Sequence, residues 1–398
     1  MKSREWNRRE FIVKPILWAG AASVFARSDL LLASSAGEPA TGAILQRTLG
    51  KTGLALPVVS MGVMNADVPG LVRRAYELGI RYFDTAASYQ NGRNEEMLGS
   101  VVKELGARDK VTIATKQAVR NHRQSPDAKS HFIEGVEASL KRLQMDHVDV
   151  LFYHAVDSVE DARAEGPLEA IQALKKDGKT RFIGISTHKT VEVLNEVMRV
   201  NMFDVALVML NYTMAHDAEM LSTIEKASKS GIGIIAMKTQ AGGTVRPDPK
   251  MPKELPPASQ TALLKWALNH EFVATAIPGF STYEHLEQDF SVARNLAYTD
   301  DEKKFLGDKT FAAEAEFCHQ CGQCSTDCPK QVDIPALMRS HMYAVQYGNG
   351  DMARQVVSEV APGRGLDACA ICDSCLASCR NTVQIGRKIE QLKALRLV

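Results

Sequence analysis

Short apolar runs alternate with amphipathic stretches through the middle of the chain. Eight runs have the length and composition of buried strands: Val58–Val63, Arg81–Phe83, Val111–Thr115, Val148–Tyr153, Phe182–Ile185, Phe203–Val208, Ile232–Met237 and Ala274–Ile277. Between them, apolar residues recur at helical spacing, for example in Leu71–Gly79, Lys129–Leu143, Val191–Val200 and Gln260–His270. This alternation predicts a parallel α/β fold, and eight repeats favour closure into a (β/α)8 TIM barrel. A doubly wound open sheet is the alternative, but its GxGxxG turn is absent.

Both ends of the chain fall outside the alternating pattern. A β-hairpin is expected over Leu45–Pro57, where Gly-Lys-Thr-Gly separates two short apolar stretches. Residues 1–40 precede it, and a cysteine-containing segment at 309–398 follows the last strand. We therefore expect three parts, which are an N-terminal leader at 1–40, a barrel at 41–308 and a small C-terminal domain at 309–398.

The leader has the features of an export signal. Asn7 to Lys14 (NRREFIVK) resembles a twin-arginine motif, and the apolar run after it, Pro15 to Phe25, is too short to cross a bilayer, which takes about 20 residues. Small residues at Ala33–Ala36 offer a cleavage site. We expect recognition by the Tat translocase, a periplasmic or extracytoplasmic location and no transmembrane span in the mature chain. A basic N-terminus without a targeting role and an uncleaved membrane anchor are the alternatives.

Three successive strand candidates end in ionisable residues. Asp84, Lys116 and His154 each follow an apolar run, and Tyr89 comes five residues after Asp84. Because parallel barrel strands all point the same way, these side chains are expected at one rim, where barrel enzymes carry their active sites. An aspartate after a strand is often only a turn or cap residue, but three such residues at equivalent positions favour a site.

All eight cysteines lie in two copies of one spacing. The first copy is Cys318-x2-Cys321-x2-Cys324-x3-Cys328-Pro, and the second is Cys369-x2-Cys372-x2-Cys375-x3-Cys379, with Arg380 in place of the proline. This run is typical of two-cluster bacterial ferredoxins, in which the fourth cysteine of each motif binds the other cluster. Structural zinc normally uses two separated cysteine pairs, and disulfides are the other alternative. The sequence predicts two [4Fe–4S] clusters.

The residues between the two cysteine motifs have a helical pattern. Ile334, Leu337, Met338, Met342 and Val345 recur at helical spacing. The C-terminal domain is therefore predicted to be α-helical and ferredoxin-like.

Overall charge excludes some classes of partner. The chain carries 48 basic and 47 acidic residues and has no basic run or nucleic-acid motif. This balance gives no electrostatic reason to expect nucleic acid as a partner.

From about Leu45 to Ala293 the chain resembles the aldo-keto reductase family. The resemblance rests on the FDTAxxY…NEExLG block from Phe83 to Gly99, the strand-end lysine and histidine, GKTRFIGIS at Gly178–Ser186 and AIPG at Ala276–Gly279. It implies that Tyr89 is the general acid for a carbonyl oxygen, with Lys116 and Asp84 lowering the phenol pKa from its usual value of about 10. His154 would orient the carbonyl. Members of a ferredoxin-fused branch of the family are similar over the whole chain after the signal.

The same resemblance implies a nicotinamide cofactor, NAD(P)H. Carried over by position, its candidate binding residues are Ser186, Lys238, Gly279 and Ser281, with phosphate also facing the helix N-terminus that begins there. The chain departs from the family at several neighbouring positions: Thr187 replaces an asparagine, Leu207 or Met209 a glutamine, and Gly279-Phe280 and His285 the residues that hold the 2′-phosphate of NADP. The residues leave open the choice among NADP, NAD and neither.

Two functions follow from these patterns. The first is an oxidoreductase (an EC 1.1.1-type enzyme) that reduces a small carbonyl compound, or oxidises the alcohol, and carries two [4Fe–4S] clusters. The alternative is an exported iron–sulfur protein that passes electrons to a redox partner protein, with a barrel that no longer uses nicotinamide. The intact Asp84, Tyr89, Lys116 and His154 set favours the first function, whereas the export signal and the altered cofactor positions favour the second.

Overall fold

The computed structural model describes residues 42–66, 68–119, 125–241, 258–308, 316–372 and 374–397. Residues Ala40–Val398 form one compact unit. The predicted signal at 1–40, the proline-rich stretch Pro247–Pro257 and the expected domain boundary at 309 lie outside the described residues.

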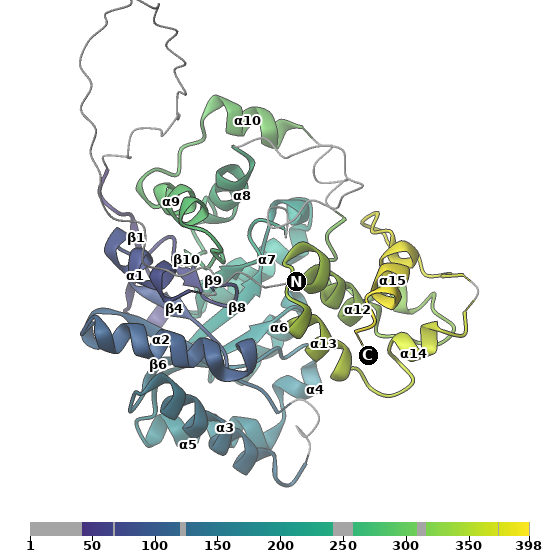
Figure 1. Cartoon of the computed structure of the whole chain (residues 1–398), viewed down its shortest axis with the longest axis horizontal. Coiled ribbons are helices and arrows are strands. Elements are labelled where there is room, and N and C mark those ends of the chain that lie inside the picture. The colour runs from purple at the N-terminus through teal and green to yellow at the C-terminus, as the bar shows by residue number, and fades with distance from the viewer. Residues whose placement is uncertain are drawn as a thin grey trace, which may run out of the picture. The chain divides into compact units, whose positions relative to one another are not determined.

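An eight-stranded sheet forms the centre of this unit (Figure 1). Neighbouring strands are all parallel and follow one another in chain order. They are β3 (Met61–Gly62), β4 (Tyr82–Asp84), β5 (Thr112–Gln117), β6 (Val148–Tyr153), β7 (Thr180–Thr187), β8 (Val205–Met209), β9 (Gly233–Met237) and β10 (Thr275–Ala276).

Two backbone bridges join the first strand of the sheet to the last. Val59 pairs with Ala276 and Gly62 pairs with Gly279, both in the parallel sense. The sheet is therefore a (β/α)8 barrel-like closed ring, as the alternation of strands and helices predicted. A Cβ atom at Gly62 would lie 2.9 Å from the carbonyl oxygen of Ile277, so only glycine allows this close approach.

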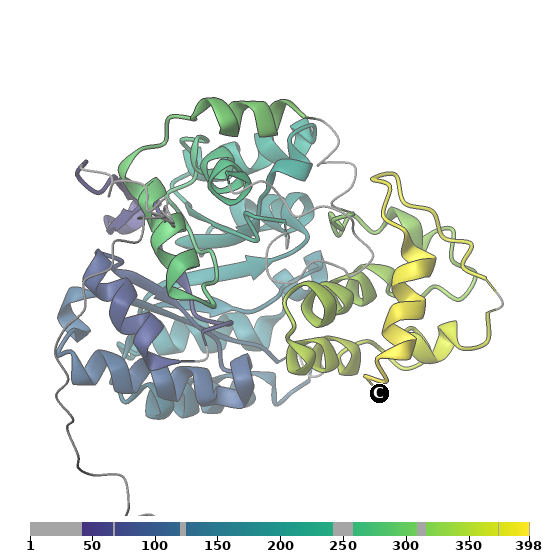
Figure 2. The same cartoon turned by 45° about the horizontal axis from the view of Figure 1, so that its top comes forward.

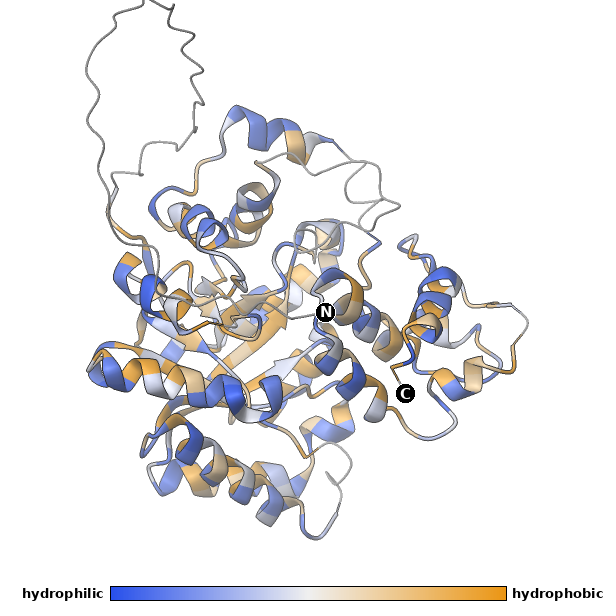
Figure 3. Ribbon diagram, in the orientation of Figure 1, coloured by the Kyte–Doolittle hydropathy of each residue, from blue (hydrophilic) through white to orange (hydrophobic). Residues whose placement is uncertain are grey.

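Helices connect the strands and cover the outside of the ring. They are α1 (Pro69–Leu78), α2 (Arg93–Glu104), α3 (Ala128–Leu143), α4 (Val159–Ala162), α5 (Glu165–Lys176), α6 (Thr190–Val200), α7 (Ala218–Lys229), α8 (Ser259–Leu268), α9 (Tyr283–Ser291) and α10 (Asp300–Gly307). Short 3-10 turns are η1 (Gly50–Thr52), η2 (Tyr89–Gly92), η3 (Arg108–Lys110), η5 (Tyr212–Met214) and η6 (Val292–Arg294). Figure 3 shows apolar residues concentrated on the strands, and mixed faces on the helices around them.

The predicted hairpin closes one end of the ring. Strands β1 (Gln46–Thr48) and β2 (Ala55–Pro57) pair antiparallel. Leu49 and Leu56 from this hairpin belong to the buried cluster inside the ring, together with Tyr82, Phe152 and other strand residues. Burial of large apolar side chains here fixes the hairpin to the end of the barrel opposite the carboxyl ends of the strands.

The residues after the barrel form a helical segment with its own small core. It contains η7 (Gln323–Ser325), α12 (Ile334–His341), the π-helical turn η8 (Met342–Gln346), α13 (Gly350–Ser358), α14 (Leu366–Cys369) and α15 (Ile385–Ala394). Figure 2 shows α12 and α13 side by side, with α15 packed against α12. We call residues 316–397 the cysteine module.

The cysteine module and the barrel share one continuous core. Met342, Tyr343, Met352 and Val356 belong to the same buried cluster as the residues between the sheet and its covering helices. A second cluster, which includes Leu337, Ile389 and Leu392, holds the module's own helices together.

Strand and helix boundaries differ from the predicted ones by a few residues. The longest difference is at Val58–Val63, where only Met61–Gly62 is a strand and Val59 contributes a single bridge. None of the described helices is long and apolar enough to span a bilayer.

Candidate active site

The strand ends bring the four predicted catalytic residues together. Asp84 ends β4, Lys116 lies near the end of β5, and His154 follows β6 directly. These three and Tyr89 line one pocket at the carboxyl end of the barrel. Parallel register is the cause, because it places the end of each strand at the same edge.

Asp84 and Lys116 form a buried ion pair. The Lys116 Nζ atom contacts the Asp84 carboxylate and also donates to the carbonyl oxygen of Thr85 at 2.6 Å. Both residues are 1% exposed. Burial raises the pKa of Asp84 and lowers the pKa of Lys116, while the attraction between the two charges opposes both shifts. Each group compensates the charge of the other away from water.

Tyr89 is held between the lysine and the histidine. Lys116 Nζ donates to its hydroxyl at 3.3 Å and lies 4.8 Å from the centre of its ring. The His154 ring meets the Tyr89 ring edge-on, with 6.1 Å between centroids. The phenol oxygen therefore faces an ammonium group with an imidazole beside it, which suits transfer of a proton to a carbonyl oxygen.

The backbone after Tyr89 makes a tight turn to place this ring. Gln90 and Asn91 adopt left-handed conformations with φ of 51° and 55°, and Gly92 follows with φ of 87°. Such conformations are costly for residues other than glycine and concentrate at functional sites.

Two polar residues after this turn hold the strand ends in place. The side chain of Asn94 accepts from Thr85 Oγ1 at 2.7 Å and donates to the carbonyl oxygen of Val63 at 2.7 Å. Glu95, fully buried, accepts from Thr115 Oγ1 and pairs with Arg142. The structure thus gives the Asn-Glu pair of the sequence block a supporting role, because both side chains bond residues on strands next to the site.

The predicted cofactor residues have different places relative to the pocket. Ser186, Lys238 and Gly279 line it. Ser186 is buried, and its Oγ accepts from the backbone N–H of Ala155 at 2.9 Å. Ser281 is exposed, outside the pocket lining, and its Oγ lies 3.5 Å from His285 Nδ1 just before α9.

Two further polar atoms in this pocket lack a hydrogen-bond partner among the described residues. They are His188 Nε2 and Thr239 Oγ1, both buried and both on pocket-lining residues. Buried polar atoms without partners are rare in native proteins. His188 Nε2 can accept a hydrogen bond when Nδ1 donates to Asp157, and Thr239 Oγ1 can donate or accept, so a ligand that carries an amide group, such as a nicotinamide dinucleotide, fits such a surface.

Sequence reasoning missed Tyr343 and Tyr347, which reach the pocket from the cysteine module. Lys238 Nζ donates to the Tyr343 hydroxyl at 3.2 Å and lies 5.1 Å from the centre of that ring. The two tyrosine rings are 5.8 Å apart. Their spacing of four residues in the predicted helix was the available signal, but nothing in the sequence tells which surface that helix face contacts.

His188 is a third residue that sequence reasoning missed. Its backbone N–H donates to Asp157 Oδ1 at 2.8 Å, and its Nδ1 lies 3.4 Å from Asp157 Oδ2. Burial lowers its pKa to about 4, against the opposing attraction of Asp157. His188 is therefore a neutral imidazole at neutral pH.

The thiol groups of the cysteine module interact in two sets. The charges of Cys324, Cys379 and Cys321 all act on Cys318, whose pKa burial raises to about 12. Cys328, Cys372 and Cys375 act in the same way on Cys369, whose pKa burial raises to about 11. Each set combines the first three cysteines of one motif with the fourth of the other. We call them set one (Cys318, Cys321, Cys324, Cys379) and set two (Cys328, Cys369, Cys372, Cys375).

No group of three or more His, Cys, Asp or Glu residues in the described ranges is placed to hold a single metal ion. Zinc ligands must lie about 2.3 Å from one ion. The charge interactions nevertheless group the thiols of each set.

Comparison with known proteins places the barrel in a family. A model of the aldo/keto reductase family matches residues 61–263. L-galactose dehydrogenase from Arabidopsis thaliana is 29% identical over 287 residues, which cover 63% of this chain and 88% of that protein. The cysteine module lies beyond the end of the family match.

Solved structures share the barrel fold. An aldo-keto reductase from Bacillus halodurans in its holo form superposes with a TM-score of 0.57 at 23% identity and covers 67% of this chain and 96% of its own. An aldo-keto reductase from Klebsiella pneumoniae, solved in complex with NADPH, has a TM-score of 0.54 at 21% identity and covers 66% and 94%.

Proposed function

Because the chain belongs to the aldo/keto reductase family and is an oxidoreductase, we propose that it reduces a small carbonyl compound, or oxidises the corresponding alcohol, with Tyr89 as the general acid. The observation that carries this proposal is the contact of Tyr89 with Lys116 and His154 in one pocket. A positioned proton donor of this kind typically contributes about 10²–10⁴-fold to the rate.

Tyr89, Lys116 and His154 each have one role in this reaction. During reduction, Tyr89 gives its hydroxyl proton to the carbonyl oxygen. The Lys116 ammonium, 3.3 Å away, stabilises the phenolate that remains. His154 donates a hydrogen bond that orients the carbonyl oxygen toward Tyr89. In the oxidation direction the same phenolate takes the proton from the alcohol.

A bound nicotinamide cofactor would supply a hydride to the carbonyl carbon in its reduced form, NAD(P)H, or accept one from the alcohol carbon in its oxidised form, NAD(P)+. Ser186, His188 and Thr239 are the residues that would contact its amide, and Lys238 with Gly279 would face its phosphates. The unpartnered His188 Nε2 and Thr239 Oγ1 support this assignment. Ser281 and Thr282, before α9, remain candidates for the outer phosphate, since the N-terminus of a helix favours anions.

The cysteine module is proposed to bind two [4Fe–4S] clusters. Sets one and two follow the exchange of the fourth ligand that the repeated spacing predicts. A [4Fe–4S] cluster is held by four cysteine thiolates, which is the number that each set provides. Its irons would also compensate the clustered thiolate charges. This domain is thus a ferredoxin-like module fused to the barrel.

The alternative function, an iron–sulfur electron carrier with an inactive barrel, has less support, since the catalytic groups form an assembled pocket. We also propose export through the twin-arginine route and a redox partner protein for the clusters. Replacing Arg8 and Arg9 by lysines in a full-length fusion to a periplasmic reporter should block export. Continued export would contradict this proposal.

Turnover tests the catalytic proposal directly. The wild-type protein, assayed with NADPH and then NADH against a panel of small aldehydes and ketones, should turn over at least one of them. Tyr89→Phe should lower kcat/KM for that substrate by about 10²–10⁴-fold. Tyr283→Phe, at a residue that is 50% exposed, is the matched control and should keep the wild-type rate. A Tyr89→Phe enzyme within a few-fold of wild type would contradict the assignment of the acid.

A further inference from the structure

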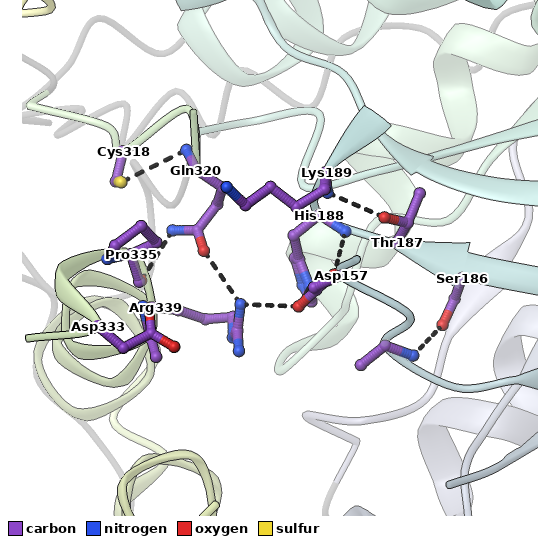
Figure 4. Close-up of polar contacts among 12 residues, drawn as sticks. Asp157, Ser186, Thr187, His188, Lys189, Cys318, Gln320, Asp333, Pro335 and Arg339 are labelled. Carbon is purple, nitrogen blue, oxygen red and sulfur yellow. Dashed lines mark hydrogen bonds and ion pairs between the residues drawn. The ribbon is translucent and has the colours of Figure 1, made fainter. Parts of the chain in front are cut away.

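A chain of polar contacts joins the first cysteine motif to the barrel. Figure 4 shows Arg339, on α12, between Asp157 of the barrel and Gln320 of the motif. Its Nη1 atom donates to Asp157 Oδ2 at 3.2 Å and to Gln320 Oε1 at 3.0 Å. The Arg339 side chain is 12% exposed, so these contacts are largely shielded from water.

Gln320 carries the contact on to a cysteine. Its side-chain Nε2 donates to the carbonyl oxygen of Pro335 at 3.0 Å, and its backbone N–H points to Cys318 Sγ at 3.4 Å. The residue is buried and has a left-handed φ of 59°. The side-chain bonds to Arg339 and Pro335 thus hold the backbone in the conformation that directs its N–H at the sulfur.

On the barrel side the chain of contacts ends at the active-site pocket. Asp157 accepts from His188, and His188 lines the pocket that contains Tyr89. His188 and Lys238 also line a second, smaller hollow, together with Cys318, Gln320 and Arg339. His188 and Lys238 therefore line both the catalytic pocket and the hollow beside Cys318.

Set two has no such connection. Among the described residues, no hydrogen bond or ion pair joins Cys328 or the segment from Cys369 to Cys375 to the barrel. Instead Ile371 and Leu376, next to its cysteines, are 71% and 69% exposed. Cys318 of set one therefore lies beside the barrel, whereas exposed apolar side chains flank the cysteines of set two.

Resting on the proposed binding of two clusters, we propose that Arg339 is a positioning residue that couples the cluster of set one, and only that cluster, to the barrel pocket. It acts in two ways. It fixes Gln320 so that the N–H of Gln320 bonds to Cys318, and it places a positive charge between the cluster and Asp157. Hydrogen bonds to the sulfurs and nearby charge are what set the potentials of such clusters.

The charge of Arg339 determines the direction in which it shifts the reduction potential of the set-one cluster. Reduction adds negative charge to a cluster, so a nearby cation and an N–H donor favour the reduced form and raise the potential. Arg339→Gln removes the cation and leaves Asp157 without its counterion, and both changes lower the potential of the set-one cluster. Asp157→Asn removes the anion and should raise it.

The experiment is a redox titration monitored by electron paramagnetic resonance on the anaerobically purified full-length protein. The two signals are assigned beforehand with Cys321→Ser for set one and Cys375→Ser for set two. Arg339→Gln should shift the set-one potential downward and Asp157→Asn upward, with the set-two potential unchanged in both. Arg339→Lys should recover part of the wild-type value. Arg354→Gln, in an exposed ion pair with Asp351 on α13, is the control and should shift neither.

The possible results distinguish a failure of the Arg339 coupling from a failure of the cluster assignment. If the wild-type protein shows no iron–sulfur signal after anaerobic reconstitution, the cluster assignment fails and the coupling fails with it. If both clusters are present but the set-one potential is unmoved, or if both potentials shift equally, only the coupling by Arg339 is overturned. Opposite shifts in Arg339→Gln and Asp157→Asn, confined to set one, support it even if one variant is less stable.

Discussion

The barrel pocket and the cysteine module handle buried charge in different ways. In the pocket, Lys116 and Asp84 compensate each other within the protein and are joined before any ligand arrives. In the module, burial and the neighbouring thiols raise the pKa values of Cys318, Cys324 and Cys369 to between about 11 and about 12. The barrel pocket pairs its buried cation with a buried anion, whereas burial disfavours the charged form of the cysteine thiols.

This difference indicates how each region is built. Strand ends of a barrel are fixed by the sheet, so a pocket assembled there is preorganised for catalysis. A cluster site is assembled from loops around a metal group, and the binding free energy of that group contributes to folding.

The fourth cysteine of each motif is proposed to bind the cluster of the other motif. Testing this should give the largest effect after the loss of turnover in Tyr89→Phe. Cys379→Ser should alter the same cluster signal as Cys324→Ser, and Cys328→Ser the same signal as Cys369→Ser. Iron content and paramagnetic resonance spectra of the four variants measure this. If Cys379→Ser instead altered the signal affected by Cys369→Ser, each motif would bind its own cluster.

Breaking the ion pair in the barrel should be costly. Lys116→Met leaves the Asp84 carboxylate buried and uncompensated, and removal of one partner of a buried pair typically destabilises by about 3–5 kcal/mol. Chemical denaturation followed by circular dichroism measures the loss.

The double variant Asp84→Asn with Lys116→Met is the control for this prediction. It should regain much of the lost stability because no uncompensated charge remains. A double variant as unstable as Lys116→Met alone would show that packing, and not charge, holds the two residues in place.

Asp289 is a buried carboxylate on α9, without a cation partner in the described ion pairs. It accepts from Gln240 Nε2 at 2.8 Å, and burial raises its pKa from 3.8 to about 7. The folded state therefore binds a proton that the unfolded state releases between about pH 4 and pH 7, and this group makes the protein less stable as pH rises through that window.

Asp289→Asn should remove this pH dependence. The variant should match wild type near pH 4 and exceed it above pH 7, by a few kcal/mol at most, since one pKa unit corresponds to about 1.4 kcal/mol. Denaturation midpoints at a series of pH values check this. An equal difference at every pH would assign the effect to packing.

The smallest effect is expected where the module enters the barrel pocket. Tyr343→Phe keeps the ring but removes the hydroxyl that accepts from Lys238. We expect KM for the substrate or the nucleotide to change by less than about tenfold, equivalent to about 1.4 kcal/mol, with kcat changed less. Tyr76→Phe, outside the pocket, should change neither. A loss of kcat as large as that of Tyr89→Phe would make Tyr343 part of the proton transfer.

The sequence predicted best the features that depend on short stretches of residues, namely the strands and the ionisable residues at their ends. The apolar runs gave the eight strands to within a few residues, and their ends placed Asp84, Lys116 and His154 at one rim. The family resemblance added Ser186, Lys238 and Gly279, which do line the pocket. The cysteine spacing predicts that each set combines three cysteines of one motif with the fourth of the other, and this assignment stays a prediction.

The contacts between the barrel and the module could not be predicted in this way. Arg339 meets Asp157 across 182 positions in the chain, and Tyr343 meets Lys238 across 105. The helical pattern correctly predicted α12, but it did not predict the π-helical turn at Met342–Gln346, two residues of which pack into the barrel core. Periodicity identifies an apolar face and not the surface that covers it.

Binding of nicotinamide by the anaerobically purified, cluster-loaded protein tests the account most directly. NADPH and then NADH would be titrated while nicotinamide fluorescence and cluster absorbance are followed together, in wild type and in Tyr89→Phe. The account predicts that at least one nucleotide binds both proteins with similar affinity, and that only wild type then reduces an added carbonyl compound. If neither nucleotide binds, the hydride reaction is wrong and the barrel does not use nicotinamide.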